Sequence, residues 1–207
     1  MFVALLTKKN YMKKILFLLM VSSFVIAAKA QFGFNAGINI SSMHGSDVDN
    51  SFKSKIGFHA GAFYNIAVAN SISVQTEASY SGEGAKVDAD GESGKYELGY
   101  LNIAALFRYN FQGGFNLGTG PQYGFLLSAK AKGSGQTVDI KDQMKSGNFS
   151  WAFAAGYDLP MGVGFYGRYN LGLSKIVDET GVDVKASSFQ IGVRYTINKG
   201  EGKSKSK

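Results

Sequence analysis

The 207-residue sequence contains no cysteine and only two prolines. Without cysteine, neither a disulfide framework nor a thiolate metal site can form. Long apolar runs are also missing: the run at 15–28 has 14 residues, whereas a helix that spans a bilayer needs about 20. These absences argue against disulfide-stapled folds, zinc–thiolate domains and helical membrane proteins.

Acidic residues are absent from the first 30 positions, which carry five lysines. The formal net charge is +7, from 22 basic and 15 acidic residues. Without segments 1–30 and 199–207, which hold nine lysines and one glutamate, 13 basic and 14 acidic residues remain. The basic excess therefore belongs to the two ends and does not indicate a nucleic-acid surface.

The N-terminal segment has the pattern of a secretory signal peptide. Met12-Lys13-Lys14 precedes the apolar run, and Ala28-Lys29-Ala30 supplies a small-x-small end. We expect a signal peptide at 1–30, with Met12 as an alternative start. The C-terminal segment 198–207 is rich in Lys, Ser and Gly and is expected to be a disordered periplasmic tail.

The sequence is rich in glycine and aromatic residues, with 27 Gly, 16 Phe and 11 Tyr. Between 149 and 173, bulky apolar residues such as Phe153 and Phe165 alternate with small or polar ones such as Ala154 and Arg168. This period of two indicates strands with one apolar face. Because the apolar face is large and aromatic, it fits a barrel with hydrocarbon outside and a polar interior.

The same alternation predicts eight strands, at 32–42, 55–66, 71–81, 95–109, 114–129, 149–158, 163–173 and 187–197. Short turns are expected at 67–70, 110–113 and 159–162, and long polar loops at 43–54, 82–94, 130–146 and 174–186. Short turns on one side and long loops on the other are typical of bacterial outer-membrane barrels. The fold class predicted for 31–197 is therefore an all-β, eight-stranded antiparallel up-and-down transmembrane β-barrel, closed because lipid tolerates no open sheet edge.

The interior of an eight-stranded barrel is just wide enough for its own side chains. We predict a buried Glu77–Arg168 pair with Arg108 or Arg194 close by, because bidentate arginine geometry satisfies such a site best. A polar network that fills the lumen is favoured over a gate or conduction path. Its predicted members are Glu77, Arg108, Arg168, Arg194, Tyr100, Gln122 and His59.

The first strand, Phe32-Gly-Phe-Asn-Ala-Gly-Ile-Asn-Ile-Ser, and the final-strand segment Gly192-Val193-Arg194-Tyr195 resemble a known family. This is the PorT-like outer-membrane β-barrel, or porin-family, domain of Bacteroidetes-type bacteria. The resemblance covers 31–197 and implies a location in the bacterial outer membrane.

The last strand also resembles the terminal-strand signal that the barrel-assembly machinery reads during insertion. Gln190, Gly192, Tyr195 and Ile197 carry the pattern. In that pattern the chain usually stops at an aromatic residue, whereas this strand ends on Ile197 and ten residues follow.

Two predicted loops contain clustered acids: Asp47 and Asp49 in the first, and Asp88, Asp90 and Glu92 in the second. Oxygen ligands at alternate positions can hold Ca²⁺. Neither cluster completes the twelve-residue calcium loop, so solvated acidic loops are favoured and no cofactor is expected.

His44 lies near Ser41, Ser42 and Asp47. A lipid A acyltransferase uses a rim histidine and serine on an eight-stranded barrel, but it also has a helix before the first strand and an apolar lumen pocket. The sequence shows neither feature, so no enzymatic activity is predicted.

The expected function is that of a non-enzymatic outer-membrane scaffold. Its four surface loops would interact with outer-membrane lipid, lipopolysaccharide or an unidentified partner, and no nucleic acid is expected. Two alternatives remain: small-solute permeation through the barrel, and a secreted soluble barrel that binds an apolar ligand inside. The direction in which the apolar face points distinguishes the last alternative from the other two.

Overall fold

The computed structural model describes residues 30–48, 51–89, 92–133 and 135–197. The predicted signal peptide up to residue 29 and the predicted tail 198–207 lie outside the described residues. Within the described ranges, no helix combines the length and the apolar character needed to cross a bilayer.

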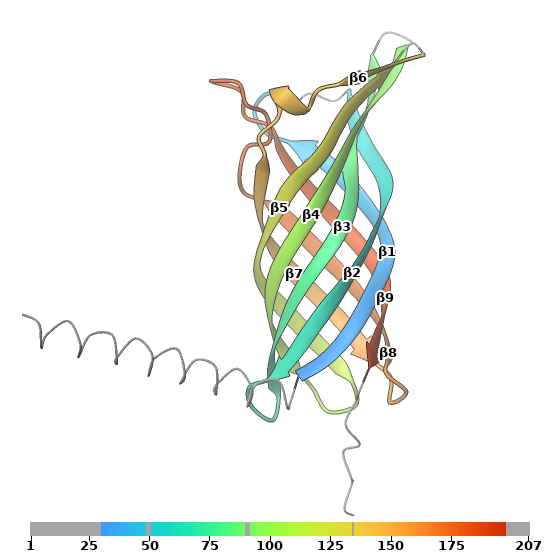
Figure 1. The fold of residues 1–207 in the computed structure, drawn as a ribbon, viewed down its shortest axis with the longest axis vertical. Helices are drawn as coiled ribbons and strands as arrows, with labels where there is room; N and C mark the ends of the chain where they lie inside the picture. Colours follow the sequence, from blue (N-terminus) through green and yellow to red (C-terminus); the bar gives the residue numbers. More distant parts are fainter. Residues whose placement is uncertain (1–29, 49–50, 90–91, 134, 198–207) are drawn as a thin grey trace, which may run out of the picture. The chain divides into compact units, whose positions relative to one another are not determined.

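The described residues form almost nothing but antiparallel strands (Figure 1). Eight of them close into a ring in the order β1-β2-β3-β4-β5-β7-β8-β9, and a short ninth strand, β6, pairs with the outer end of β5. This confirms the predicted eight-stranded antiparallel barrel. The strands are β1 Ala30–His44, β2 Phe52–Ala67, β3 Ile72–Ala89, β4 Glu92–Asn110, β5 Phe115–Gly133, β6 Gln136–Asp139, β7 Gly147–Asp158, β8 Val163–Gly172 and β9 Lys185–Ile197, with the 3₁₀ helix η1 at Lys141–Gln143.

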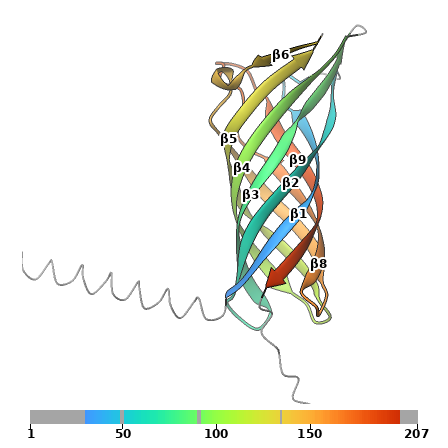
Figure 2. The ribbon, with the colours of Figure 1, turned by 45° about the vertical axis from the view of Figure 1, so that its right-hand side comes forward.

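The first and last strands close the barrel. β1 pairs with β9 from Phe32↔Ile197 to His44↔Lys185, and the two strands run side by side in Figure 2. Closure leaves none of the eight ring strands as a free edge within the barrel wall, so the backbone groups there are paired. This is the condition that a hydrocarbon solvent imposes on a spanning sheet.

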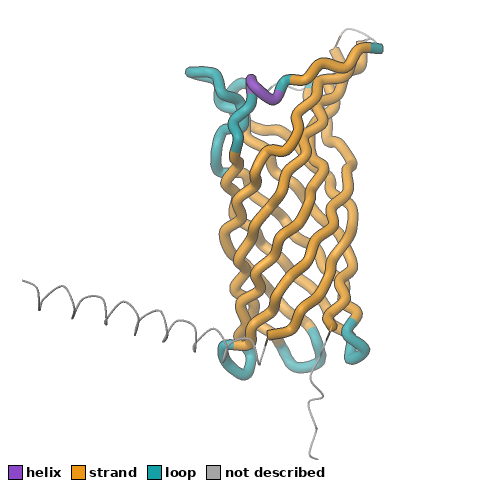
Figure 3. Tube along the Cα trace, viewed as in Figure 1, coloured by secondary structure: helices purple, strands orange, loops and turns teal. Residues whose placement is uncertain are grey.

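The two ends of the barrel differ in the length of their connections. The turns 68–71, 111–114 and 159–162 lie at one end, together with the start of β1 and the end of β9, and the longer connections lie at the other (Figure 3). The third of these turns touches the last strand, where Thr196 N donates to Gly162 O at 2.9 Å. The predicted asymmetry is confirmed, and below we call the end with long connections the outer end.

Two of the predicted long loops are wrong in their structure. Most of 82–94 continues β3 and β4 as paired strand, and the start of 130–146 continues β5 and adds β6. Together with the first residues of β2 they form a sheet that extends beyond the barrel (Figure 1). We call this extension the protruding sheet: 52–54, 84–89, 92–98, 129–133 and β6.

Within the barrel wall most large apolar side chains point outward, and Phe63 and Leu106, which are 2% and 1% exposed, are inward exceptions. Phe153, Phe165 and Ile191 are 50%, 54% and 50% exposed, whereas Glu77 and Arg168 are 5% and 3% exposed. The predicted orientation is therefore confirmed. A barrel with an apolar interior, as the soluble ligand-binding alternative requires, is contradicted.

The polarity of the two faces changes near a β-bulge between β4 and β5. Gly99 pairs with Ser128 and Tyr100 with Leu126, so Leu127 is the extra residue on β5. Beyond it, Leu98 is buried on the inner face while Glu97 and Lys95 lie outside. The charged outer face there suits contact with water, whereas Leu98 on the inner face packs against Tyr100 and Leu126. The bulge thus marks the outer limit of the lipid-facing wall.

Candidate functional site

An ion pair crosses the middle of the lumen. Arg168 Nη1 donates to Glu77 Oε1 at 2.9 Å, and Arg168 Nη2 donates to Glu77 Oε2 at 2.7 Å. Glu77 lies on β3 and Arg168 on β8, which stand four strands apart around the ring in either direction. The predicted bidentate pair is present, and it ties opposite walls together.

A second charged cluster lies at the inner end of the lumen, around Asp158. Its carboxylate accepts hydrogen bonds from Arg108 Nη2 at 3.1 Å and from Arg194 Nε at 2.7 Å. Arg194 Nη2 also donates to Asn116 Oδ1 at 3.0 Å. The two arginines expected beside the Glu77–Arg168 pair are thus both held by Asp158.

Gln75 connects the two charged clusters. Its Nε2 donates to Glu77 Oε2 at 3.2 Å, and its Oε1 accepts from Arg108 Nη1 at 2.9 Å. Gln75 is 2% exposed and was not among the predicted members of the network. Its position on the inward face of the same strand as Glu77, two residues away, is the signal that could have identified it.

Toward the outer end, His59 is held by two neutral groups. His59 Nδ1 lies 2.6 Å from Asn39 Oδ1, and Nε2 lies 2.5 Å from the Tyr166 hydroxyl. The Arg168 guanidinium stands over the Tyr166 ring, 5.6 Å from its centroid. Tyr166 therefore links His59 to the central ion pair: its hydroxyl contacts His59, and the face of its ring contacts Arg168.

Tyr100 does not belong to the polar network, which corrects the prediction for this residue. It is buried among apolar residues, and its hydroxyl has no hydrogen-bond partner among the described residues. Gln122 is buried inside the barrel, and its membership of the polar network stays a prediction. We call the apolar group around Tyr100 the apolar cap: Leu98, Tyr100, Leu126, Ala129, Ile176, Val184 and Ala186, with Met43, Val48, Ile140, Met144, Val177 and Val182 packed against it.

Two outer connections supply the centre of the cap. Ile176 is 1% exposed, and its N–H donates to Val184 O at 2.9 Å. Lys145 N donates to Ile176 O at 2.9 Å, and Met144 forms an isolated bridge with Val177. The loops between β6 and β7 and between β8 and β9 are thereby joined over the outer end of the lumen.

The lumen is therefore obstructed at three levels. Salt bridges cross it at the centre and at the inner end, and the apolar cap packs at the outer end. A solute would have to displace buried ion pairs as well as packed apolar side chains. The arrangement favours a structural interior over a conduction path.

The acids proposed as calcium ligands are not brought together in the described structure. Asp49 and Asp90 lie outside the described residues, and Asp88 and Glu92 belong to strands β3 and β4, not to a loop. The Asp47 carboxylate accepts from Asp183 N at 2.7 Å, which holds the pKa of Asp47 below its ordinary value. Within the described ranges, no group of three or more His, Cys, Asp or Glu could hold a metal ion.

Ser41 and His44 at the outer rim contact different residues. Ser41 Oγ is 2.8 Å from Gly84 O, to which it donates, and it is 1% exposed. His44 Nδ1 lies 3.5 Å from Ser187 Oγ. These contacts do not assemble a His44–Ser41 catalytic pair.

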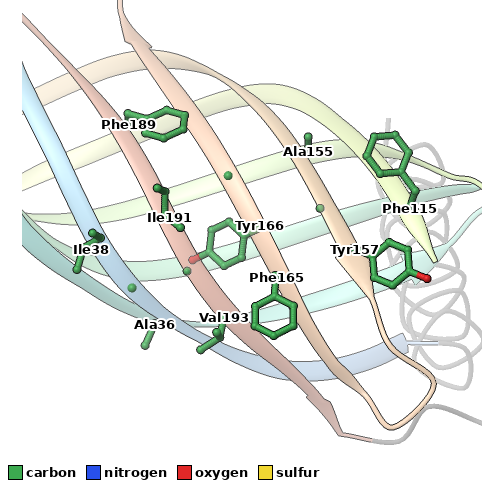
Figure 4. A pocket seen from close by; sticks show the side chains of 14 residues that line it. Ala36, Ile38, Phe115, Ala155, Tyr157, Phe165, Tyr166, Phe189, Ile191 and Val193 are labelled. Carbon is green, nitrogen blue, oxygen red and sulfur yellow. The ribbon is translucent and has the colours of Figure 1, made fainter.

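An apolar hollow of about 740 Å³ lies on the outward surface of β1, β9, β8 and β7 (Figure 4). Small residues, Ala36, Ala155 and Gly167, form it, and Phe165 and Tyr157 stand beside them. Because it opens on the lipid-facing side of the wall, acyl chains fill it in a membrane.

The four residues of the predicted assembly signal lie on β9, the strand that closes the barrel. Gln190 is 1% exposed and points inward, whereas Tyr195 and Ile197 are 52% and 38% exposed on the outward face. Gly192 is buried between Gly37 of β1 and Tyr166 of β8. Recognition of this strand by the assembly machinery remains a prediction.

On the outer face of the protruding sheet, Glu97 binds two lysines. Its carboxylate accepts from Lys132 Nζ at 2.8 Å and from Lys95 Nζ at 3.0 Å. The hydrogen bond from Lys132, followed by that from Lys95, lowers the pKa of Glu97 to about 2. These residues lie beyond the bulge and therefore outside the lipid-facing wall.

We expect the Glu97 side chain to titrate with a midpoint of about 2. Since its pKa is lowered in the folded state, the stability that it contributes is present above the ordinary value of 4.5 and is lost as the pH falls toward 2. Lys132→Gln should move the midpoint upward, because Lys132 is the largest cause of the shift. A side-chain carboxyl NMR titration measures both midpoints, and an unchanged midpoint in the variant would contradict the assignment.

Comparison with solved structures finds other outer-membrane barrels. Neisserial surface protein A is 16% identical over 81% of this chain and 99% of its own, with a TM-score of 0.51. OprG from Pseudomonas aeruginosa is 16% identical over 82% of this chain and 96% of its own, also with a TM-score of 0.51. At this identity the likeness concerns the fold alone. Among curated proteins, no match is found.

The comparison with protein families reaches further, because it rests on the sequence. The model of the outer membrane protein beta-barrel domain matches residues 22–178, which is most of the chain. This match agrees with the closed ring of eight strands and with the outward apolar wall. On these grounds, the chain belongs to the outer membrane protein beta-barrel domain family.

Proposed function

We propose that this protein is a non-enzymatic outer-membrane scaffold that presents its outer connections at the cell surface for contact with the envelope or with a partner. The observation that carries the proposal is the obstructed lumen. Ion pairs cross it at two depths, fully buried at Glu77–Arg168 and partly buried at Asp158, and the apolar cap packs over its outer end. Small-solute permeation, the second function that this fold can serve, is disfavoured by the same observation.

Three further points belong to the proposal. The Phe32–Ser41 and Gly192–Tyr195 segments support a PorT-like type within the family. Residues far apart in the sequence meet in the outer connections, as Asp47 and Asp183 do. This ordering of the connections supports a surface that a partner could recognise. The absence of a His44–Ser41 pair from the described contacts supports a role without catalysis.

Single-cysteine labelling tests the orientation that the proposal needs, and the chain is suited to it because it has no native cysteine. Thr180, in the connection between β8 and β9, and Asn70, in the turn between β2 and β3, are both exposed. We expect a membrane-impermeant maleimide to label Thr180→Cys on intact cells.

Asn70→Cys is the matched control and should be labelled only after the cells are lysed. Because both positions are exposed in turns, their intrinsic reactivities are comparable. Equal labelling of the two variants on intact cells, or labelling of neither before lysis, would reject surface presentation of the β8–β9 connection.

A further inference from the structure

Four lysines stand in one row across the outer face of the protruding sheet. Lys53 of β2 faces Lys86 of β3, Lys86 faces Lys95 of β4, and Lys95 faces Lys132 of β5. Directly opposed residues on one face have Cβ atoms about 4.5–5.5 Å apart. We call this row the lysine ladder.

In the described structure, acidic side chains pair with only two of the four lysines of the ladder. Glu97 binds Lys95 and Lys132, but no ion pair to Lys53 or Lys86 is present within the described ranges. Like charges directly opposed across strands destabilise a sheet. A row of four is therefore a feature that an external anion would stabilise.

The position of the ladder indicates where that anion lies. On β5, Leu127 is the extra residue of the bulge and the last outward apolar residue, and Lys132 follows five residues later on the same side of the sheet. Five residues of strand tilted by about 40° rise roughly 13 Å above the hydrocarbon edge. The backbone of Lys132 therefore stands above the head-group layer, which is about 5–8 Å thick in each leaflet. Long lysine side chains that extend back toward the membrane can bring their ammonium groups to its outer boundary.

We propose that the lysine ladder binds the phosphate groups of an anionic glycolipid in the outer leaflet. A lipid is favoured over a soluble anion because the ladder continues the lipid-facing surface of β3, β4 and β5, directly above Tyr80, Leu101 and Leu127. This inference deepens the proposed function, on which it rests, by naming the lipid class that one surface contacts.

Lipid retention provides the test. The full chain is folded in nanodiscs of zwitterionic phosphatidylcholine that contain increasing fractions of bis-phosphorylated lipid A. The lipid A bound per barrel is then measured by native mass spectrometry. Each lysine near an anionic membrane surface contributes about fivefold in affinity, so K53Q/K86Q should need roughly 25-fold more lipid A for half occupancy. The substitution removes like-charge repulsion and should leave folding intact, which a heat-modifiability gel checks.

K141Q/K145Q is the matched control, since it removes the same charge from exposed lysines in the connection between β6 and β7. It should bind lipid A as the unmodified protein does. Equal binding by K53Q/K86Q, an equal loss in K141Q/K145Q, or undiminished binding of dephosphorylated lipid A would each overturn the proposal. Displacement of lipid A by an equimolar amount of sodium triphosphate would reassign the ladder to a soluble anion.

The two proposals can fail separately. If labelling shows Thr180 at the cell surface while lipid A binding does not depend on Lys53 and Lys86, the ladder is rejected and the scaffold orientation stands. If Thr180 is not at the surface, the proposed function fails first, whatever the lipid A titration gives.

Discussion

Replacing Arg168 by methionine is expected to destabilise the folded barrel by about 3–5 kcal/mol, because it leaves the Glu77 carboxylate buried without its partner. Glu77 and Arg168 are 5% and 3% exposed, so water cannot replace the two lost hydrogen bonds. The pair also ties β3 to β8 across the lumen. Urea unfolding in phospholipid vesicles, followed by the gel mobility of the folded form, measures the change.

The control for this prediction is the double variant Glu77→Met/Arg168→Met. Replacing both members of a buried ion pair by apolar residues of similar size is often nearly neutral. We therefore expect most of the stability lost in Arg168→Met to return. A double variant as unstable as the single one would show that the cost arises from packing around Arg168 and not from the unpaired carboxylate.

Replacing Ile191 by arginine is expected to cost about 2–4 kcal/mol in the same unfolding assay, since a cation would face hydrocarbon near the middle of the bilayer. Ile191 lies outward on β9, opposite Ile38 of β1 and Gly167 of β8, and is 50% exposed. In a soluble barrel, an exposed position of this kind would accept arginine at little cost.

Ile72→Arg is the matched control, because Ile72 is 45% exposed on the same outward face but begins β3 beside a short turn. Near the interface an arginine costs about 0–1 kcal/mol. A similar loss in both variants would contradict the assigned depth of Ile191, and no loss in either would contradict lipid contact.

The barrel wall could be predicted because its outer face meets hydrocarbon and its inner face meets a polar lumen, so apolar and polar residues alternate along each strand. Alternation of large apolar with small or polar residues fixed both the strands and their orientation, as for Phe153 and Phe165 against Glu77 and Arg168. The Glu77–Arg168 pair could be predicted because both residues face inward at a similar distance from the short turns.

The protruding sheet could not be predicted by the same rule. At Lys86, Lys95 and Lys132 the outward residue becomes charged, and a run of Gly, Lys and Asp resembles a loop when apolar residues are taken as the mark of a strand. Above the membrane, strand pairing continues while the outer solvent is water, so the alternation persists with reversed polarity.

Tyr100 shows a different limit of sequence reasoning. Its inward direction was predicted correctly, but its neighbours Ile176 and Val184 come from a connection more than 70 residues away in the chain. Local alternation does not reveal which distant loop will cover an inward position. A tyrosine in the lumen was therefore assigned to the polar network, although it lies in the apolar cap.

The lysine ladder has a consequence for how the barrel enters its membrane. A chain inserted from the periplasm must carry the tips of β2 to β5 through the hydrocarbon, where each ammonium group costs about 2–4 kcal/mol. Four such groups form a barrier to translocation, and the same barrier opposes withdrawal once they reach the far side. In the orientation proposed above, the lysine ladder would therefore oppose both reversal of the barrel and its withdrawal from the membrane.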